Sequence, residues 1–377
     1  MKRFLLKLGL FFLPFAAVFS VPVAVLVLSD EILSGDEIAK KHFEGSHDAV
    51  YGAAYTNPDA RYKLVGLALR QPEVMALGSS RALEIQGNFF IGNNDVFYNA
   101  GLLVERLYEF RRALAHLPKE ATTKKLILVL DQSSFNPNWP NAVDNPQFEA
   151  EVGTGRSDVL NLIQHGFRSW RDIVGDRLDL LTLATAHPHI GVNGRMRGNG
   201  FAWDGSRVYA DILRDPEGAS DFQFKDSLER IAQGSKHFEF GAEVDQPAVA
   251  EIQQLLAECQ RRGFSVTAYL APFAPTVDRA MRASTKHAYV SKIAPALAPI
   301  FAAAGVTLFD FTSCEAHGCR DEEFFDGFHA GPKADARLIA VVADNVPWLD
   351  AMIDQDDLRS RVARSPRGPL LAPRDDS

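Results

Sequence analysis

Short apolar runs alternate with segments of helical length along most of the chain, and this alternation limits the fold more than any other feature. Five runs have the length and composition of buried strands: Val74–Leu77, Asp95–Tyr98, Leu126–Leu130, Phe264–Leu270 and Val306–Phe311. Strands of this kind, joined by helices, form parallel sheets through right-handed crossovers. The sequence therefore predicts an α/β fold with a parallel sheet that is covered by helices on both faces.

The segments between these runs carry helical signals. Apolar residues spaced by three and four positions predict an amphipathic helix over 103–117. A second helix is predicted over 245–262, where Asp245 can cap its start and Gly263 suits its end. Pro332–Val342 is expected to form the last helix of the core.

The N-terminus predicts a membrane anchor. Three cations precede Leu8–Leu28, which contains no charged residue and is followed by Asp30 and Glu31. A helix needs about 20 apolar residues to cross a bilayer core of about 30 Å, and cations before the span place the N-terminus in the cytoplasm. The alternative is that residues 1–29 are a cleaved signal peptide, although no small-x-small cleavage site follows the run. Both readings place the rest of the chain outside the cytoplasm.

The charge and the cysteines of the chain limit which binding partners, disulfides and metal sites can be expected. The net charge is −8 and no Lys/Arg-rich block lies beyond the first residues, which argues against nucleic acid as the main partner. Cys314 and Cys319 flank a four-residue loop and could form a small disulfide in an oxidising compartment. A metal site with His317 is the alternative, but it lacks a fourth ligand at a recognisable spacing, so no metal or other cofactor is predicted. Cys259 is expected to be a buried, reduced thiol.

Changes in composition divide the rest of the chain into a juxtamembrane segment, a domain with an insertion, and a tail. Residues 30–71 read as a juxtamembrane segment with short helical stretches, and 72–355 form the predicted domain. The alternation is lost over 136–244, which we interpret as an inserted cap beside the active site. The insertion contains Trp139, Trp170 and Trp203, which would form either a carbohydrate surface or the insertion's own small core. The tail 356–377 is rich in Pro, Arg and Asp and is predicted to be disordered.

Three motifs are expected at one edge of the sheet, where ligands bind in open α/β folds. Gly78-Ser79-Ser80 follows the first strand, Asn99-Ala100-Gly101 follows the second, and Asp326-Gly327-Phe328-His329 precedes the last helix. A serine hydroxyl needs a base to become a nucleophile. An acid three residues before a histidine can orient that base and stabilise its protonated form. The motifs therefore predict nucleophilic serine chemistry.

These motifs resemble the first, second and fifth sequence blocks of the SGNH, or GDSL-type, hydrolase superfamily, and they occur in the same order over residues 72–345. The resemblance implies a three-layer, flavodoxin-like fold. It also implies Ser80 as nucleophile, His329 as general base and Asp326 as the orienting acid. Ser79 is the minor alternative for the nucleophile. The backbone N–H groups of Ser80 and Gly101 would stabilise the oxyanion, with Asn99 in the same substrate-binding motif.

The Gly-Ser-Ser variant and the N-terminal anchor together resemble a narrower group, the membrane-tethered SGNH proteins that modify bacterial cell-surface polymers. Periplasmic alginate O-acetylation proteins and the D-alanine-transfer protein of lipoteichoic acid are examples. This resemblance implies a serine esterase or O-acyltransferase that is held in the inner membrane by residues 8–28 and acts in the periplasm on a glycan or an acylated polymer. It further implies a multi-pass membrane-bound O-acyltransferase as a partner.

One departure from the superfamily pattern leaves an alternative open. The third block should supply an oxyanion-binding Asn after the third strand, but residues 131–136 contain no Gly-x-Asn. Gln132 and Asn136 are the candidates to replace it. Loss of one such donor typically lowers the rate ~100- to 1000-fold. The alternative is thus a catalytically weak or silent module that binds glycan or scaffolds an acyltransferase complex. Arg81, beside the nucleophile, is expected either to be solvated or to bind an anionic substrate.

Overall fold

The structure is a computed structural model that describes residues 1–56, 59–92, 95–117, 123–139, 147–153, 159–175 and 177–374. The chain divides into two compact units. Unit 1 contains Met1–Val65, Glu149–Trp203 and Arg207–Asp211, and unit 2 contains Gly66–Phe148, Asp204–Ser206 and Ile212–Ser377. The expected insertion is therefore not one element. Most of it groups with the N-terminal segment, whereas its last part belongs to the unit that contains the sheet.

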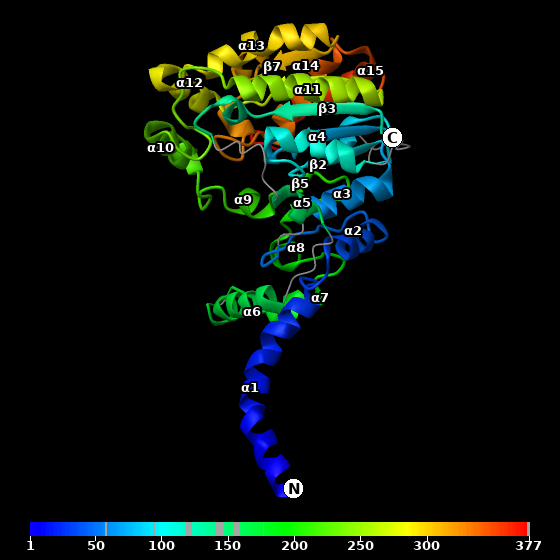
Figure 1. The fold of residues 1–377 in the computed structure, drawn as a ribbon, viewed down its shortest axis with the longest axis vertical. Coiled ribbons are helices and arrows are strands. Elements are labelled where there is room, and N and C mark those ends of the chain that lie inside the picture. Colours follow the sequence, from blue (N-terminus) through cyan, green and yellow to red (C-terminus); the bar gives the residue numbers. More distant parts are fainter. Residues whose placement is uncertain are drawn as a thin grey trace. The chain divides into compact units, whose positions relative to one another are not determined.

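Unit 2 is built on a parallel sheet of five strands in the order β2-β1-β3-β6-β7 (Figure 1). The strands are β1 Val74–Gly78, β2 Phe97–Gly101, β3 Lys125–Leu130, β6 Ser265–Leu270 and β7 Thr307–Asp310. Counted along the chain, this order is 2-1-3-4-5, the order of flavodoxin-like folds. The predicted α/β fold with a parallel sheet is confirmed.

The second strand differs most from its prediction. The prediction placed it over 95–98, whereas β2 extends to Gly101, which pairs in parallel register with Gly78 at the end of β1. Because the Asn99-Ala100-Gly101 motif is part of the strand, its backbone takes part in the sheet instead of following it.

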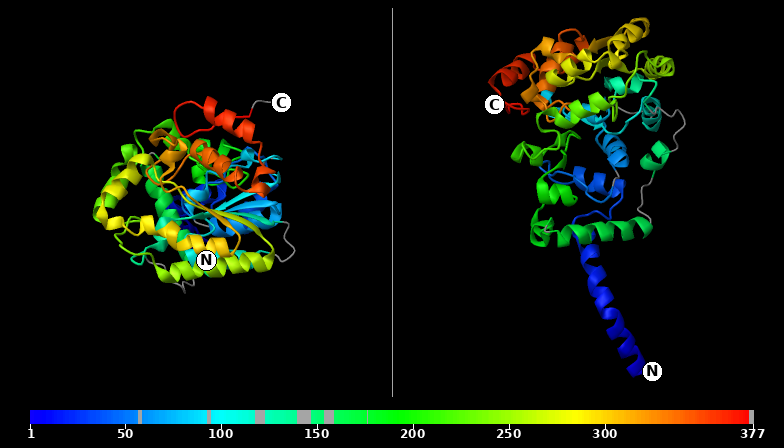
Figure 2. Two further views of the ribbon diagram at one scale, coloured as in Figure 1. Left: turned by 90° about the horizontal axis from the view of Figure 1, so that it is seen from above. Right: turned by 90° about the vertical axis from the view of Figure 1, so that its left-hand side faces the viewer.

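Helices cover both faces of this sheet (Figure 2). One layer contains α4 Leu107–His116, α11 Gln246–Arg262 and α13 Val290–Ala303, which pack on one another, and the other contains α14 Pro332–Ala343, α15 Pro347–Asp350 and α16 Gln355–Arg364. The predicted end of α11 is confirmed, since Gly263 has a left-handed φ of 73°. Helix α4 begins four residues later than predicted. The reason is local, because the Glu109 carboxylate accepts the backbone N–H groups of Glu105 and Arg106 and caps the helix there.

The prediction of a disordered tail is wrong for most of its length. Residues 355–364 form α16, which packs on α14. Leu358 and Val362 are buried, and the Arg361 guanidinium donates to the backbone oxygens of Asn88 and Ala372. The polar composition hid this helix, because its buried face consists of only two apolar residues and an arginine, which is too little apolar periodicity to detect. Residues 375–377 lie outside the described part of the chain.

Peripheral elements complete unit 2. They are η1 Ser80–Ala82, η2 Gly87–Phe89, η4 Gln132–Phe135, η5 Phe222–Phe224, α10 Lys225–Gln233, α12 Pro275–Ala283, η6 Thr285–His287, η7 Cys314–His317 and η8 Asp321–Glu323. Three described helices each contain a position at which the chain passes from one unit to the other: α3 Asp59–Arg70, α5 Gln147–Val152 and α9 Ala210–Arg214.

Unit 1 contains α1 Lys2–Leu28, α2 Gly35–Phe43, α6 Val159–Val174, α7 Leu180–Thr185, α8 Val192–Arg197, β4 Gly200–Phe201 and β5 Arg207–Val208. Its segments meet at Glu31, directly after α1. The buried Glu31 carboxylate accepts hydrogen bonds from the backbone N–H groups of Ala54, Tyr55, Thr56 and Val192. Trp203 stacks on His47 with ring centroids 3.9 Å apart, which favours the small-core interpretation for this tryptophan.

Helix α1 is bent. Its two parts, Lys2–Ala16 and Val18–Leu28, meet at 50°. Among the described helices, none is long and apolar enough to cross a membrane as a single straight helix, and these two parts meet the requirement only as a pair.

All three cysteines are free and buried, so the expected disulfide is not formed. A hydrogen bond between the Cys314 and Cys319 thiols, together with burial, raises the pKa of Cys314. Burial raises the pKa of Cys259 to about 12, as expected for a reduced core thiol. No group of three His, Cys, Asp or Glu side chains in the described ranges could hold a metal ion.

Asp335 on α14 generates a prediction about stability and pH. It is buried, and both carboxylate oxygens lack a hydrogen-bond partner among the described residues. Burial raises its pKa to about 8, although Arg81 acts in the opposite direction. A carboxyl group whose pKa is higher in the folded state than in the unfolded state makes the protein less stable as the pH rises from the unfolded-state pKa to the folded-state pKa. Relative to Asp335→Asn, the wild type should lose about 1.4 kcal/mol of unfolding free energy per pH unit between about pH 4 and 8.

Urea unfolding at several pH values measures this difference. Asp344→Asn is the matched control, because Asp344 follows the same helix but is 47% exposed and pairs with Arg359. The control should retain the pH dependence of the wild type. Parallel curves for the wild type and Asp335→Asn would contradict the prediction.

Candidate active site

The structure brings together the three side chains that the sequence predicted as a triad, all within unit 2. Ser80 begins η1 directly after β1, and Asp326 and His329 lie in the loop before α14. The Ser80 Oγ lies 2.8 Å from His329 Nε2, although the two residues are 249 positions apart in the sequence. His329 Nδ1 lies 2.8 Å from Asp326 Oδ2. These contacts form a continuous chain from hydroxyl to imidazole to carboxylate.

The second Asp326 oxygen holds the loop. Asp326 Oδ1 accepts the backbone N–H groups of Phe328 and His329, each at 2.7 Å. Burial by itself would raise the pKa of Asp326, but the charge and hydrogen bond of His329 and these two N–H groups lower it to about 2. An ionised carboxylate only accepts hydrogen bonds, so His329 Nδ1 carries the proton and Nε2 is left to accept from Ser80. His329 and Asp326 are 24% and 28% exposed, so solvent and ligands can reach the site.

The same loop is supported by residues that the sequence did not single out. Asp221 Oδ2 accepts the N–H of Gly327 at 2.8 Å and the hydroxyl of Ser227 at 2.6 Å. A Cβ on Gly327 would lie 2.5 Å from Ser227 Oγ and 2.6 Å from Val277 Cγ2, so close packing requires glycine in the Asp-Gly-Phe-His motif. Asp221 and Ser227 lie in the part of the insertion that showed no motif, so only the folded chain reveals their role.

Arg81 is neither solvated nor placed to bind a substrate, and both expectations for it are wrong. Its side chain is 1% exposed and lies between the rings of Phe273 and Phe328, with the guanidinium carbon 4.5 Å and 4.3 Å from their centroids. The guanidinium donates to the backbone oxygens of Phe328 and Pro272 and to Gln132 Oε1. It thereby joins the serine turn, the histidine loop and the ends of two further strands.

Asn99 and Gly101 are also used by the fold. The Asn99 amide nitrogen donates to the carbonyl oxygens of Ala82 and Ile85 at 2.7 and 2.8 Å, and its Oδ1 accepts the Gly101 N–H at 2.8 Å. The expectation that Gly101 offers its N–H to an oxyanion is therefore wrong for this structure. Instead, Asn99 closes the turn that follows Ser80. The N–H of Ser80 itself lies in the first turn of η1, where helix geometry leaves such groups without an intrahelical partner.

Neither candidate for the third oxyanion donor is available. Gln132 is fully buried, and its amide nitrogen donates to Ala271 O at 2.7 Å and to Thr312 Oγ1 at 2.8 Å. Asn136 is fully buried as well, and its amide nitrogen donates to Glu239 O at 2.6 Å. Both amides stabilise loops around the site.

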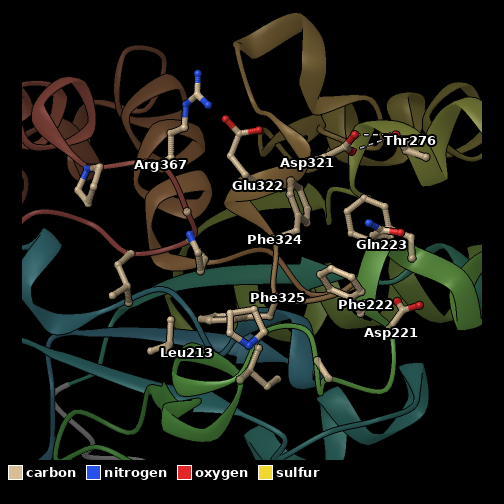
Figure 3. A pocket seen from close by; sticks show the side chains of 18 residues that line it. Leu213, Asp221, Phe222, Gln223, Thr276, Asp321, Glu322, Phe324, Phe325 and Arg367 are labelled. Atoms are coloured by element: carbon tan, nitrogen blue, oxygen red, sulfur yellow. Dashed lines mark hydrogen bonds between the residues drawn. The ribbon is translucent and has the colours of Figure 1, made fainter.

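Two cavities border this region. A small one of about 140 Å³ contacts Asp326 and His329 and is also lined by Ser220, Asp221, Asp226, Ser227, Arg230, His237 and Phe328. A larger one of about 780 Å³ shares only Asp221 with it and contains no member of the triad. Figure 3 shows the rings of Phe222, Phe324 and Phe325 around the larger cavity. Its wall contacts the triad loop through the backbone, since the Phe325 N–H donates to His329 O at 3.0 Å.

The geometry determines what the site can do. A serine hydroxyl bound to a histidine that is oriented by an ionised carboxylate is the arrangement that makes serine a nucleophile. No family model, curated protein or solved structure matches the chain. The chemical interpretation therefore depends on the atoms of the site and on the sequence motifs.

Breaking the Arg81 contacts should destabilise unit 2. Arg81→Met would remove the hydrogen-bond donor of Gln132 Oε1 and of two backbone oxygens. It would also remove the cation that lies 3.5 Å from Asp131. Disruption of a buried ion pair costs about 3–5 kcal/mol, so the unfolding free energy in urea should fall by about that amount.

Arg359→Met is the control for this change, because it removes an arginine whose ion pair with Asp344 is half exposed. Exposed pairs contribute about 0–1 kcal/mol, so this variant should unfold close to the wild type. Equal effects of the two substitutions would show that the buried contacts of Arg81 do not stabilise the fold.

Proposed function

We propose that this chain is an SGNH-type serine esterase or O-acyltransferase that carries an acyl group on Ser80. The observation that supports the proposal most strongly is the pair of 2.8 Å contacts that link Ser80, His329 and Asp326 at the carboxyl edge of the sheet. The flavodoxin-like strand order is consistent with this assignment. The order of the three sequence motifs adds independent support.

The proposed reaction has two half-reactions. In the first, Ser80 Oγ attacks the acyl carbon while His329 Nε2 accepts the hydroxyl proton. The carbonyl electron pair moves to oxygen, where the Ser80 N–H stabilises it. The bond to the leaving alcohol then breaks and His329 returns the proton to that alcohol. In the second, water or a sugar hydroxyl attacks the acyl carbon while His329 accepts its proton. The bond between the acyl carbon and Ser80 Oγ then breaks, and His329 returns the proton to Ser80. Asp326 remains ionised throughout and stabilises the imidazolium.

The proposed substrate is a glycan or an acylated polymer of the cell envelope. We propose that residues 8–28 anchor the chain in the inner membrane and that unit 2 acts in the periplasm beside a multi-pass membrane-bound O-acyltransferase. Support comes from the charge-free N-terminal run with its flanking charges and from the Gly-Ser-Ser variant of the first motif. The membrane-tethered SGNH proteins that modify surface polymers combine these features.

A second candidate function is a module that binds glycan or scaffolds an acyltransferase without turnover. The specific observation in its favour is that the polar groups expected at the oxyanion, the Gly101 N–H and the Gln132 and Asn136 amides, already have partners. The intact contacts of Ser80 favour the enzyme over this alternative, since a scaffold has no need of an activated hydroxyl.

Reactivity of the full-length chain with a fluorophosphonate probe tests the proposal. The wild type should be labelled and Ser80→Ala should not, because the probe reacts with an activated serine. Hydrolysis of p-nitrophenyl acetate should fall by about 10⁴-fold or more in Ser80→Ala, and by a similar factor in His329→Ala.

Ser284→Ala is the control. Like Ser80, Ser284 is a serine at the start of a 3-10 helix, but it is the N-cap of η6 outside the triad loop, so labelling should persist. An unlabelled wild type would exclude the enzyme and favour the scaffold. Labelling that survives in Ser80→Ala would show that another residue is the nucleophile.

A further inference from the structure

The proposed acyl transfer needs more stabilisation of negative charge than the strand ends provide. With the Gly101 N–H engaged and the side-chain amides of Gln132 and Asn136 fully buried, the Ser80 N–H is the remaining donor from the strand-end motifs. An oxyanion in a water-excluded site is normally held by two or more donors. A further donor must therefore come from another part of unit 2, and the cavity beside the triad is the place to look for it.

His237 borders this cavity together with His329. It lies between α10 and α11, in the last part of the insertion. Its ring centroid is 4.2 Å from that of Trp139 and 5.2 Å from that of Phe328, whose ring is in turn 5.4 Å from the His329 ring. The His237 Nδ1 atom is buried and has no hydrogen-bond partner within the described ranges.

The backbone at this position is strained. Lys236 and His237 have φ values of 51° and 78°, in the left-handed region that residues other than glycine rarely adopt. Two successive residues of this kind persist only where the surrounding structure imposes them, and such residues cluster at functional sites. The backbone conformation and the tilted ring contact with Trp139 together hold the His237 ring against the cavity.

Burial and several nearby charges favour the neutral form of His237. Burial lowers its pKa, and Arg81, His329 and Arg230 lower it further, while Asp131 acts in the opposite direction. The Arg230 charge is itself paired with Asp226. A neutral imidazole carries one N–H, which can bind an oxygen atom without placing a second full positive charge beside His329.

We propose that His237 is a catalytic hydrogen-bond donor whose imidazole N–H binds the acyl carbonyl oxygen while Ser80 attacks. This inference rests on the proposed acyl transfer. It assigns to the insertion a role in the chemistry itself and explains how the site can work without an Asn after β3. No covalent bond to His237 forms, and its proton stays on the imidazole throughout.

Kinetics of His237 variants of the full-length chain with p-nitrophenyl acetate test the inference. Removal of an oxyanion donor typically lowers kcat ~100- to 1000-fold, so His237→Ala should show a loss in this range. Its KM should change by less than about threefold, because the donor acts mainly in the transition state. His237→Asn restores an N–H donor and should recover at least about tenfold of the lost kcat.

His287→Ala is the matched control. His287 is also buried with an unpartnered Nδ1, and its Nε2 contacts Phe238 O, but it borders a different cavity. His287→Ala and His237→Ala should lower the thermal unfolding midpoint by about the same amount. The kcat of His287→Ala should stay within about threefold of the wild type. A purely structural role for His237 would give equal kcat in the two alanine variants.

The outcomes separate the two proposals. If the wild type turns over, Ser80→Ala does not, and His237→Ala matches the wild type, only the role of His237 is overturned. The same holds if His237→Asn is no better than His237→Ala. If the wild type neither turns over the ester nor reacts with the fluorophosphonate, the acyl transfer fails and the role of His237 fails with it.

Discussion

The candidate active site depends on one buried guanidinium, that of Arg81. Arg81 lies between two phenylalanine rings and donates to backbone oxygens of two separate loops. A charge removed from water is tolerated only when its donors are satisfied, so these loops must keep their positions relative to Arg81. Arg81 directly follows Ser80, and Phe328, whose carbonyl it holds, directly precedes His329. The same contacts that satisfy the arginine thus set the distance between nucleophile and base.

The hydrogen bonds around Arg81 and Ser80 involve polar groups that the sequence motifs predicted to bind substrate. Gln132 completes the shell of Arg81, and Asn99 closes the turn after Ser80 with the help of the Gly101 N–H. The edge of the sheet is therefore rigid but poor in free donors. Two residues from the last part of the insertion lie at this edge: Asp221 accepts a backbone N–H of the histidine loop, and His237 borders the cavity. Residues of the insertion therefore take part in the structure of the candidate site.

Local patterns account for what the sequence predicted well. The apolar runs located the sheet because strands buried on both faces need continuous apolar sequence, and the motifs located Ser80, Asp326 and His329 because glycine-rich turns at strand ends are short and local. The prediction failed for Arg81 and for the tail, since charged residues look like surface residues until distant backbone oxygens are known to surround them. It failed for Gly101 because the Asn99 side chain accepts that N–H, and which way an amide side chain turns is not visible in the sequence.

Apolar spacing along the chain was enough to predict the α/β class and the strand positions to within about three residues, and the local motifs were enough to single out Ser80, Asp326 and His329. Tertiary structure decided which donors remain free, because a hydrogen-bond partner depends on residues that are hundreds of positions apart. It also decided that the tail folds and that the insertion divides between two units. Hydrophobic burial is encoded by periodicity, which a linear reading can detect. The pairing of buried polar groups is encoded by three-dimensional proximity, which only the folded chain reveals.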